Sequence, residues 1–259
     1  MPEMLEVETY RFAAEPLVGR RIERVHAPDG WYAKGDTTTE LLSSVLPGLR
    51  VIGTRRIGKL MLLDTDGPVL GLRFGMTGRI LVDDQAPIEG LEYSSDRNDP
   101  AWDRFGLSFH GGGSMMIRDP RRLGGVELDP DETRLGPDAL QVSRTGLAEV
   151  LQTTSAPIKA RLLDQSRIAG LGNLLVDDIL YRSGVAPQRP ADSLNDDDIA
   201  VVFRALRQSL ATLGRRGGSH TGDLQSERHV GGRCPKDGVE LSRASVGGRT
   251  SYWCPVHQH

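Results

Sequence analysis

Short apolar runs separated by turn residues dominate the chain between residues 20 and 126. The clearest runs are residues 51–57, 60–63, 69–74, 79–82, 105–109 and 115–117. Turn-forming residues lie between neighbouring runs, with Asp and Gly at 64–67 and three glycines at 111–113. Several short strands at such spacing are typical of a β-sandwich or a β-barrel.

Helical periodicity lies on both sides of this β region. Near the start, apolar residues among charged ones predict a short helix over residues 4–15, which Pro16 would end. In the second half of the chain we predict further helices over residues 145–151, 157–163, 173–183 and 199–213. The last is the clearest, because apolar residues recur at helical spacing behind a polar start at 195–198.

The last part of the chain indicates a loop followed by a hairpin. Residues 213–233 are rich in Gly, Arg, Ser and His, and residues 234–259 carry turn signals at Asp237-Gly238 and Gly247-Gly248. We therefore expect an α+β multi-domain protein. Its expected parts are an N-terminal β-sandwich with a leading helix at 1–130, a helical domain at 131–228 and a C-terminal β-hairpin at 229–259.

Composition narrows the class of protein. The chain has 259 residues, 38% apolar and 26% charged, with no apolar run near the roughly 18 residues of a membrane span. Its first residues are acidic where a secretory signal would be basic, so we expect a cytoplasmic protein. Two cysteines exclude a disulfide-stapled scaffold. The formal net charge of −3 argues weakly against a nucleic-acid partner.

The two cysteines lie in a pattern that can bind zinc. Cys234 and Asp237 form one pair with two residues between them, and sixteen residues later Cys254 and His257 form a second. Paired ligands at opposite ends of a hairpin can surround one tetrahedral ion, and aspartate and histidine both coordinate zinc. Two interpretations remain open, a zinc-finger-like hairpin with one zinc ion and a hairpin in which packing has replaced the metal.

A glycine-rich segment, residues 166–173, leads into the helix predicted at 173–183, and Lys159 lies upstream of it. Free backbone N–H groups at such a helix start can bind a phosphate, and Asn173 can add a side-chain donor. Glycines before a helix are also common as simple turn formers, so this segment is informative only together with other motifs.

Three motifs, in order, resemble the formamidopyrimidine-DNA glycosylase and endonuclease VIII family. Residues 168–187 are similar to the family's helix-two-turn-helix signature, the start MPEMLEVET is similar to its catalytic amino terminus, and the C-terminal pairs keep its finger spacing. The resemblance spans essentially the whole chain. It implies a bacterial, nucleoid-associated monomer that binds double-stranded DNA containing damaged bases or abasic sites, and it reverses the expectation from net charge.

The amino terminus suggests chemistry of its own. Removal of Met1 would expose the secondary amine of Pro2, and α-amino groups, with pKa values of about 8, are partly neutral and nucleophilic at neutral pH. Attack at a sugar C1′ would form an iminium that supports both base excision and strand elimination. The resemblance gives Glu3 the role of general acid and proton shuttle, and Glu6 a role in orienting the site. The plain alternative is an ordinary exposed terminus.

The resemblance assigns further residues. Lys59, which we expect on a strand, and Arg249 match residues that contact phosphate and assist elimination. Met76 and Arg121 match residues that fill the space left by a flipped-out base, and Leu123 stands where an aromatic is usual. The expected DNA contacts are Met76, Arg104, Arg121, Arg122, Leu123, Lys159 and Asn173.

Several positions depart from the family pattern. Leu5 stands for a second proline, Arg73 for a histidine and Asp178 for a glutamate, while Asp237 and His257 stand for two cysteines. These changes leave open whether the lesion is an oxidised purine, an oxidised pyrimidine or a bulkier adduct. We expect a bifunctional DNA glycosylase and AP lyase. The alternatives are a non-catalytic protein that binds damaged or abasic DNA and a zinc-ribbon interaction protein unrelated to repair.

Overall fold

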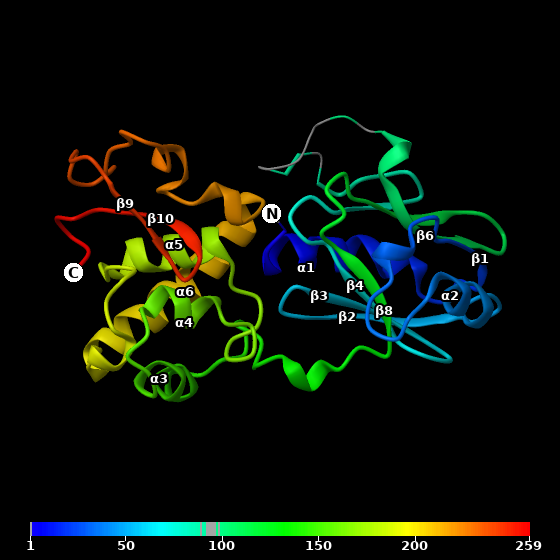
Figure 1. The fold of residues 1–259 in the computed structure, drawn as a ribbon, viewed down its shortest axis with the longest axis horizontal. Helices are drawn as coiled ribbons and strands as arrows, with labels where there is room; N and C mark the ends of the chain where they lie inside the picture. The colour runs from blue at the N-terminus through cyan, green and yellow to red at the C-terminus, as the bar shows by residue number, and fades with distance from the viewer. Residues whose placement is uncertain (1, 89, 92–96, 98) are drawn as a thin grey trace. The chain divides into compact units, whose positions relative to one another are not determined.

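A computed structural model describes residues 2–88, 90–91, 97 and 99–259 (Figure 1). The chain divides into two compact units, Met1–Glu132 and Thr133–His259, here the N-terminal and C-terminal units. Within the described ranges, no helix combines the length and the apolar character that crossing a membrane requires.

Two antiparallel four-stranded sheets form most of the N-terminal unit. One sheet has the strand order β1-β6-β7-β5 and the other β2-β3-β4-β8. The strands are β1 (Ile22–His26), β2 (Val51–Ile57), β3 (Leu60–Thr65), β4 (Leu70–Arg73), β5 (Arg79–Val82), β6 (Asp103–Phe109), β7 (Ser114–Arg118) and β8 (Gly125–Leu128). The helices of this unit are α1 (Met4–Ala14) and α2 (Thr39–Val45).

The two sheets share one hydrophobic core. Alternate residues of β6, among them Phe105 and Phe109, are buried together with Leu70 and Leu72 of β4. This period of two is what a strand with one buried face requires. Helix α1 adds buried apolar side chains, including Tyr10, to the same core. The predicted β-sandwich with a leading helix is therefore confirmed.

Several elements of this unit differ from the sequence prediction. Strands β1 and β8 and helix α2 were not predicted as separate elements. Helix α2 begins after Thr38, whose Oγ1 accepts a hydrogen bond from Leu41 N at 3.1 Å, but it buries only Leu42, so its apolar periodicity is weak. The expectation of a strand at Lys59 is wrong, because Gly58, with φ of +58°, and Lys59 form the turn between β2 and β3.

Four helices form the body of the C-terminal unit. They are α3 (Arg144–Gln152), α4 (Ile158–Leu163), α5 (Asn173–Ser183) and α6 (Asp196–Arg216). Helix α5 is buried along residues 174–181 and contacts both α4 and α6. It ends at Gly184, which adopts the left-handed conformation with φ of +71°. Helix α6 begins with a capping box between Asn195 and Asp198, as the polar start predicted.

A β-hairpin follows these helices and shares a core with them. Its strands are β9 (Ser242–Val246) and β10 (Arg249–Trp253). Tyr181 of α5 is buried in one cluster with Cys234 and Cys254. The end of the chain is tied to the same helix, because His259 N donates to the backbone oxygen of Gly184 at 3.0 Å. The helices and the hairpin therefore form one compact unit.

Short 3₁₀ helices complete both units. They are η1 (Glu15–Leu17), η2 (Gly30–Tyr32), η3 (Pro100–Trp102), η4 (Glu132–Arg134), η5 (Ala191–Ser193), η6 (Ser219–Thr221) and η7 (Gln225–Glu227). Two of them, η6 and η7, lie in the segment that the sequence predicted as a loop. The start of that segment extends α6 to Arg216, and the remainder has local order in these short helices.

Candidate functional site

Two buried carboxylates lie at the start of α1. Glu3 is the N-cap residue and has no exposed surface, and Glu6 is 2% exposed. Glu3 N donates to Glu6 Oε2 at 2.8 Å, and the two side chains form a reciprocal capping box. Pro2, directly before them, is buried. Met1 lies outside the described residues.

Tyr10 connects this helix to the segment that carries Met76. Its hydroxyl donates to the backbone oxygen of Gly78 at 3.3 Å, between β4 and β5. Burial, and after it the negative charge of Glu6, raises the pKa of Tyr10 well above its usual range. The hydroxyl therefore stays protonated and keeps its role as a donor.

Helix α1 also packs against the β2–β3 hairpin, whose turn carries Lys59. Arg56 makes this link, because its Nε donates to Glu8 Oε2 and its Nη1 to the backbone oxygen of Gly58, both at 2.7 Å. Lys59 is half-buried. The elements that carry Pro2, Glu3 and Lys59 are thus fixed to one another within the N-terminal unit.

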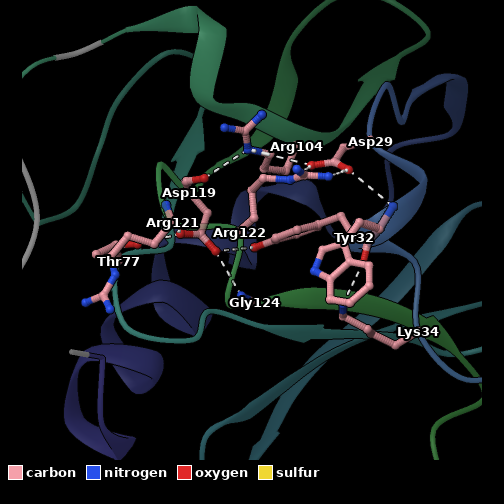
Figure 2. Close-up of polar contacts among 10 residues, drawn as sticks. Asp29, Tyr32, Lys34, Thr77, Arg104, Asp119, Arg121, Arg122 and Gly124 are labelled. Carbon is pink, nitrogen blue, oxygen red and sulfur yellow. Dashed lines mark hydrogen bonds and ion pairs between the residues drawn. The ribbon is translucent and has the colours of Figure 1, made fainter.

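The predicted DNA contacts of this unit lie on two turns and one strand. Met76 is in the turn between β4 and β5, and Arg121 and Leu123 are exposed on the loop between β7 and β8. Arg104, on β6, donates from Nε to the backbone oxygen of Asp119 at 2.9 Å (Figure 2).

Arg122 forms a bidentate ion pair. Its Nε and Nη2 donate to the two carboxylate oxygens of Asp29 at 2.6 and 2.5 Å (Figure 2). The Arg122 guanidinium lowers the pKa of the Asp29 carboxyl below its usual value. Arg104 and Arg122 thus both have hydrogen-bond partners inside the protein, and their contacts with DNA stay predictions.

The start of α5 and the C-terminal hairpin meet at Asn173. This residue is the first of the helix, after the N-cap Gly172, and its Nδ2 donates to the backbone oxygen of Thr250 at 3.3 Å. Its Oδ1 is buried without a hydrogen-bond partner among the described residues. Arg249, next to Thr250, is exposed at the start of β10. Two predicted site residues, Asn173 and Arg249, are therefore neighbours across this contact.

Lys159 does not reach the surface, which corrects the expectation that it contacts a phosphate. Its side chain has no exposed surface, and Nζ lies 2.6 Å from Asp177 Oδ1 and 3.4 Å from the backbone oxygen of Thr250. Arg228 pairs with the other oxygen of Asp177 at 2.7 Å. A buried ammonium needs such a partner, since desolvation of an unpaired charge is strongly unfavourable. Lys159 supports the hairpin from inside.

The four predicted metal ligands come together at the end of the hairpin. The donor atoms of Cys234, Asp237, Cys254 and His257 all lie within 4.8 Å of one another. Asp237 Oδ2 is central, because it lies 3.3 Å from Cys234 Sγ, 3.1 Å from Cys254 Sγ and in contact with His257 Nδ1. Two thiols, an imidazole and a carboxylate around one point are a donor set that suits zinc.

The electrostatics of this cluster differ between its members. Hydrogen bonds from His257, and then from the two thiols, lower the pKa of Asp237 to about 2. Burial raises the pKa of Cys254 to about 11. The carboxylate is therefore ready to bind a cation, whereas the thiol would give up its proton on binding one.

Sequence reasoning missed two structural carboxylates. Asp177 joins Lys159 and Arg228, and Asp119, which is fully buried, joins residues from several elements of the N-terminal unit. An aspartate flanked by ordinary residues carries no local signal for such a role, because its partners are distant in sequence. Only the neighbouring Pro120-Arg121-Arg122 could have drawn attention to Asp119.

Comparisons with known proteins cover the whole chain. The profile of the formamidopyrimidine-DNA glycosylase N-terminal domain matches residues 1–126, and that of the formamidopyrimidine-DNA glycosylase H2TH domain matches residues 135–223. Among curated relatives, the formamidopyrimidine-DNA glycosylase of Paracoccus denitrificans is 35% identical over 292 residues, with 100% of both chains covered. That of Bacillus cereus is 31% identical, covering 100% of this chain and 99% of the relative.

Solved structures give the same result. The Lactococcus lactis Fpg in complex with DNA containing an abasic site has a TM-score of 0.84 and 25% identity, with 100% of both chains covered. The same enzyme with DNA containing an oxidised pyrimidine has a TM-score of 0.83 and 25% identity, with 99% of both chains covered. The order of the motifs, the sandwich with its buried Glu3 and the finger-like hairpin agree with this result, and the chain belongs to the formamidopyrimidine-DNA glycosylase family.

Proposed function

We propose that this protein is a bifunctional DNA glycosylase and AP lyase that acts on oxidised or otherwise damaged bases in double-stranded DNA. The observation that carries the proposal is the amino terminus of α1. There Pro2 directly precedes two fully or almost fully buried carboxylates, Glu3 and Glu6, in a chain of this family. The relatives support it, since their solved complexes contain DNA with abasic sites or lesions.

The proposed nucleophile is the amine of Pro2 after removal of Met1. Its nitrogen forms a bond to C1′ of the damaged nucleotide, the bond from C1′ to the base breaks, and the base leaves with a proton. α-Amino groups have pKa values of about 8, so part of this amine is neutral and nucleophilic at neutral pH. The sugar ring then opens, because the C1′–O4′ bond breaks while O4′ takes up a proton from Glu3, and an iminium remains between the nitrogen and C1′. This iminium acidifies the C2′ proton, whose loss expels the 3′-phosphate. Water then releases the sugar and restores the amine.

The remaining site residues have supporting roles in this proposal. Glu3 supplies and removes protons, and Glu6, which accepts from Glu3 N, fixes its backbone. Lys59 and Arg249 bind the phosphates that flank the lesion and assist elimination. Met76, Arg121 and Leu123 fill the space of the flipped-out base. Arg104, Arg122 and Asn173 add contacts to the DNA backbone.

We also propose that Cys234, Asp237, Cys254 and His257 hold one zinc ion. The support is the convergence of their donor atoms within 4.8 Å. When bound, the ion would supply structural cross-linking between the two ends of the finger-like hairpin, not catalysis. It would thereby fix the strand that carries Arg249 against α5.

Three functional segments follow from this proposal, a catalytic sandwich at 1–130, a helix-two-turn-helix segment at 131–228 and a zinc-finger-like hairpin at 229–259. We further propose that the protein acts as a monomer in the bacterial cytoplasm, associated with the nucleoid, because its substrate would be chromosomal DNA.

Borohydride trapping on abasic duplex DNA tests the proposed chemistry. Reduction of the iminium should link wild-type protein covalently to DNA, whereas Pro2→Gly should trap far less, and Glu3→Gln should lower base excision by about 100-fold or more. Wild-type protein that binds abasic DNA without forming an adduct would instead favour the non-catalytic binding protein. Equal affinity for abasic and intact duplex would favour the interaction protein unrelated to repair.

A panel of duplexes identifies the lesion. It contains 8-oxoguanine, formamidopyrimidine, thymine glycol, dihydrouracil and an abasic site. Release of each damaged base, and strand cleavage at the abasic site, are measured under single-turnover conditions. Leu123, which stands where the family often has an aromatic, is the residue we expect to influence the choice of lesion. A Leu123→Phe variant should therefore change the ranking of the lesions more than the rate on the abasic site.

A further inference from the structure

Two turns of the N-terminal unit carry the side chains proposed to enter the DNA. The first, residues 75–77 between β4 and β5, presents Met76, and the second, residues 119–124 between β7 and β8, presents Arg121 and Leu123. Leu123 is 50% exposed. We call these two segments the wedge turns.

A single buried carboxylate, that of Asp119, connects both wedge turns. Its Oδ1 accepts hydrogen bonds from the Thr77 hydroxyl and from Arg121 N, the latter at 3.2 Å. Its Oδ2 accepts from Gly124 N at 2.8 Å and from the Tyr32 hydroxyl at 3.4 Å. Figure 2 shows these groups around Asp119. The residue has no exposed surface, so water does not compete for these bonds.

The backbones of the two turns also touch each other. Gly75 adopts the left-handed conformation, with φ of +57°, and a Cβ there would lie 2.6 Å from Gly124 N and overlap the carbonyl group of Leu123. Only glycine allows this approach. The contact is independent of the hydrogen bonds to Asp119, and it places the Met76 turn directly against the Leu123 turn.

A second carboxylate fixes the outer side of the loop. Arg122 has φ of +55°, a strained conformation for a residue with a side chain. Its guanidinium makes the bidentate pair with Asp29. The pair holds the backbone between Arg121 and Leu123 in this conformation, so that the two exposed side chains flank a residue that is itself tied down.

From these contacts we infer that Asp119 is a positioning residue, which holds the two wedge turns as one rigid body and so orders Met76, Arg121 and Leu123 before DNA arrives. The inference rests on the proposed function, since it presumes that these side chains enter a duplex. A wedge that is already ordered loses less conformational entropy on insertion than one assembled from two mobile turns. Asp119 itself touches neither DNA nor the reacting atoms.

The hydroxyl of Thr77 is the most selective place to test this. Thr77→Val keeps the shape of the side chain and removes the bond that joins the Met76 turn to Asp119, whereas Thr77→Ser keeps the hydroxyl. Insertion is followed by stopped-flow fluorescence of 2-aminopurine opposite an uncleavable abasic analogue in duplex DNA. In Thr77→Val the rate of the fluorescence rise should fall about tenfold, and Thr77→Ser should restore it to within about twofold of wild type.

Tyr32→Phe is the matched control. It removes a hydroxyl from the same carboxylate but from η2, outside both wedge turns. Its insertion rate should stay within about twofold of wild type, and thermal unfolding followed by circular dichroism should show Thr77→Val and Tyr32→Phe equally folded at the assay temperature. This separates positioning of the wedge from a general loss of stability.

Several results would overturn the inference. One is an insertion rate in Thr77→Val equal to that of the wild type. Another is a slowing in Tyr32→Phe or in Thr77→Ser as large as that in Thr77→Val. The last is wild-type protein that forms the borohydride adduct on abasic DNA but gives no fluorescence change. Failure of the proposed function gives a different pattern. In that case no variant forms a borohydride adduct, whatever happens to the fluorescence.

Discussion

At the scale of single residues, burial decides which charged groups serve as structure and which can meet a ligand. Lys159 and Arg249 are both basic residues close to Thr250. Lys159 is fully buried and paired with Asp177, whereas Arg249 is exposed. The sequence predicted a phosphate contact for both, and for Arg249 also a part in elimination, because residue type and distance along the chain do not reveal solvent exposure.

Replacing Lys159 should therefore affect stability before it affects DNA binding. In Lys159→Ala, Asp177 keeps Arg228 but loses a fully buried partner, and we expect a loss of about 3 kcal/mol in the free energy of unfolding. Urea unfolding of the variant and the wild type measures this loss. Without urea, where the variant is folded, the salt dependence of its DNA binding should equal that of the wild type. A shallower salt dependence would instead show that Lys159 contacts a phosphate.

At the scale of elements, one end of the C-terminal hairpin is buried and the other is exposed. The strand ends near Cys234 and Cys254 are buried against Tyr181 of α5. The opposite end, at the turn of residues 247–248, presents Arg249 to solvent beside the start of α5. One end thus anchors the hairpin, and the other is placed for contact with a ligand.

The exposed end should carry a phosphate contact. Arg249→Ala should weaken binding to damaged and intact duplex alike and reduce the slope of log K against log salt by about 1. Arg243→Ala is the matched control, because Arg243 is an exposed arginine of the same hairpin whose Nε bonds Tyr252 instead. Equal slopes for the two variants, measured by fluorescence anisotropy, would contradict the assignment.

At the scale of the whole molecule, the chain has two compact units with separate cores. The sandwich core contains residues of α1 and both sheets, and the cluster around Tyr181, Cys234 and Cys254 lies in the C-terminal unit. The formal net charge of −3 does not show where on the surface basic residues are exposed to a nucleic acid. Ion pairs such as Arg118 with Asp103 neutralise basic residues inside the fold and leave others, such as Arg249, exposed.

Metal removal should act on one unit only. We expect metal analysis of the purified protein to find one zinc per chain. Calorimetry should show two unfolding transitions, and a chelator should lower the midpoint temperature of only the transition that includes the hairpin. Cys254→Ser should reproduce this shift and abolish the effect of the chelator. Absence of zinc from the purified protein, together with an unchanged thermogram on chelation, would identify a metal-free hairpin.

The sequence by itself determined what depends on neighbours along the chain. Apolar periods of two and of about 3.6 indicated most strands and the four α-helices of the C-terminal unit. Asn195 and Gly184 marked helix ends correctly, because caps are made locally. The motifs at Pro2 and at Cys234 identified the family for the same reason. The sequence did not predict the weakly periodic helix α2, because that helix buries a single apolar residue.

Only the tertiary structure decided what depends on partners far apart in sequence. Asp119 meets Thr77 and Tyr32, Lys159 lies in the interior, and Lys59 occupies a turn instead of a strand. Hydrogen bonding and burial are fixed when separate segments pack, and no local pattern encodes the free energy of that packing. The residue types of the site thus came from the sequence, and their surroundings came from the fold.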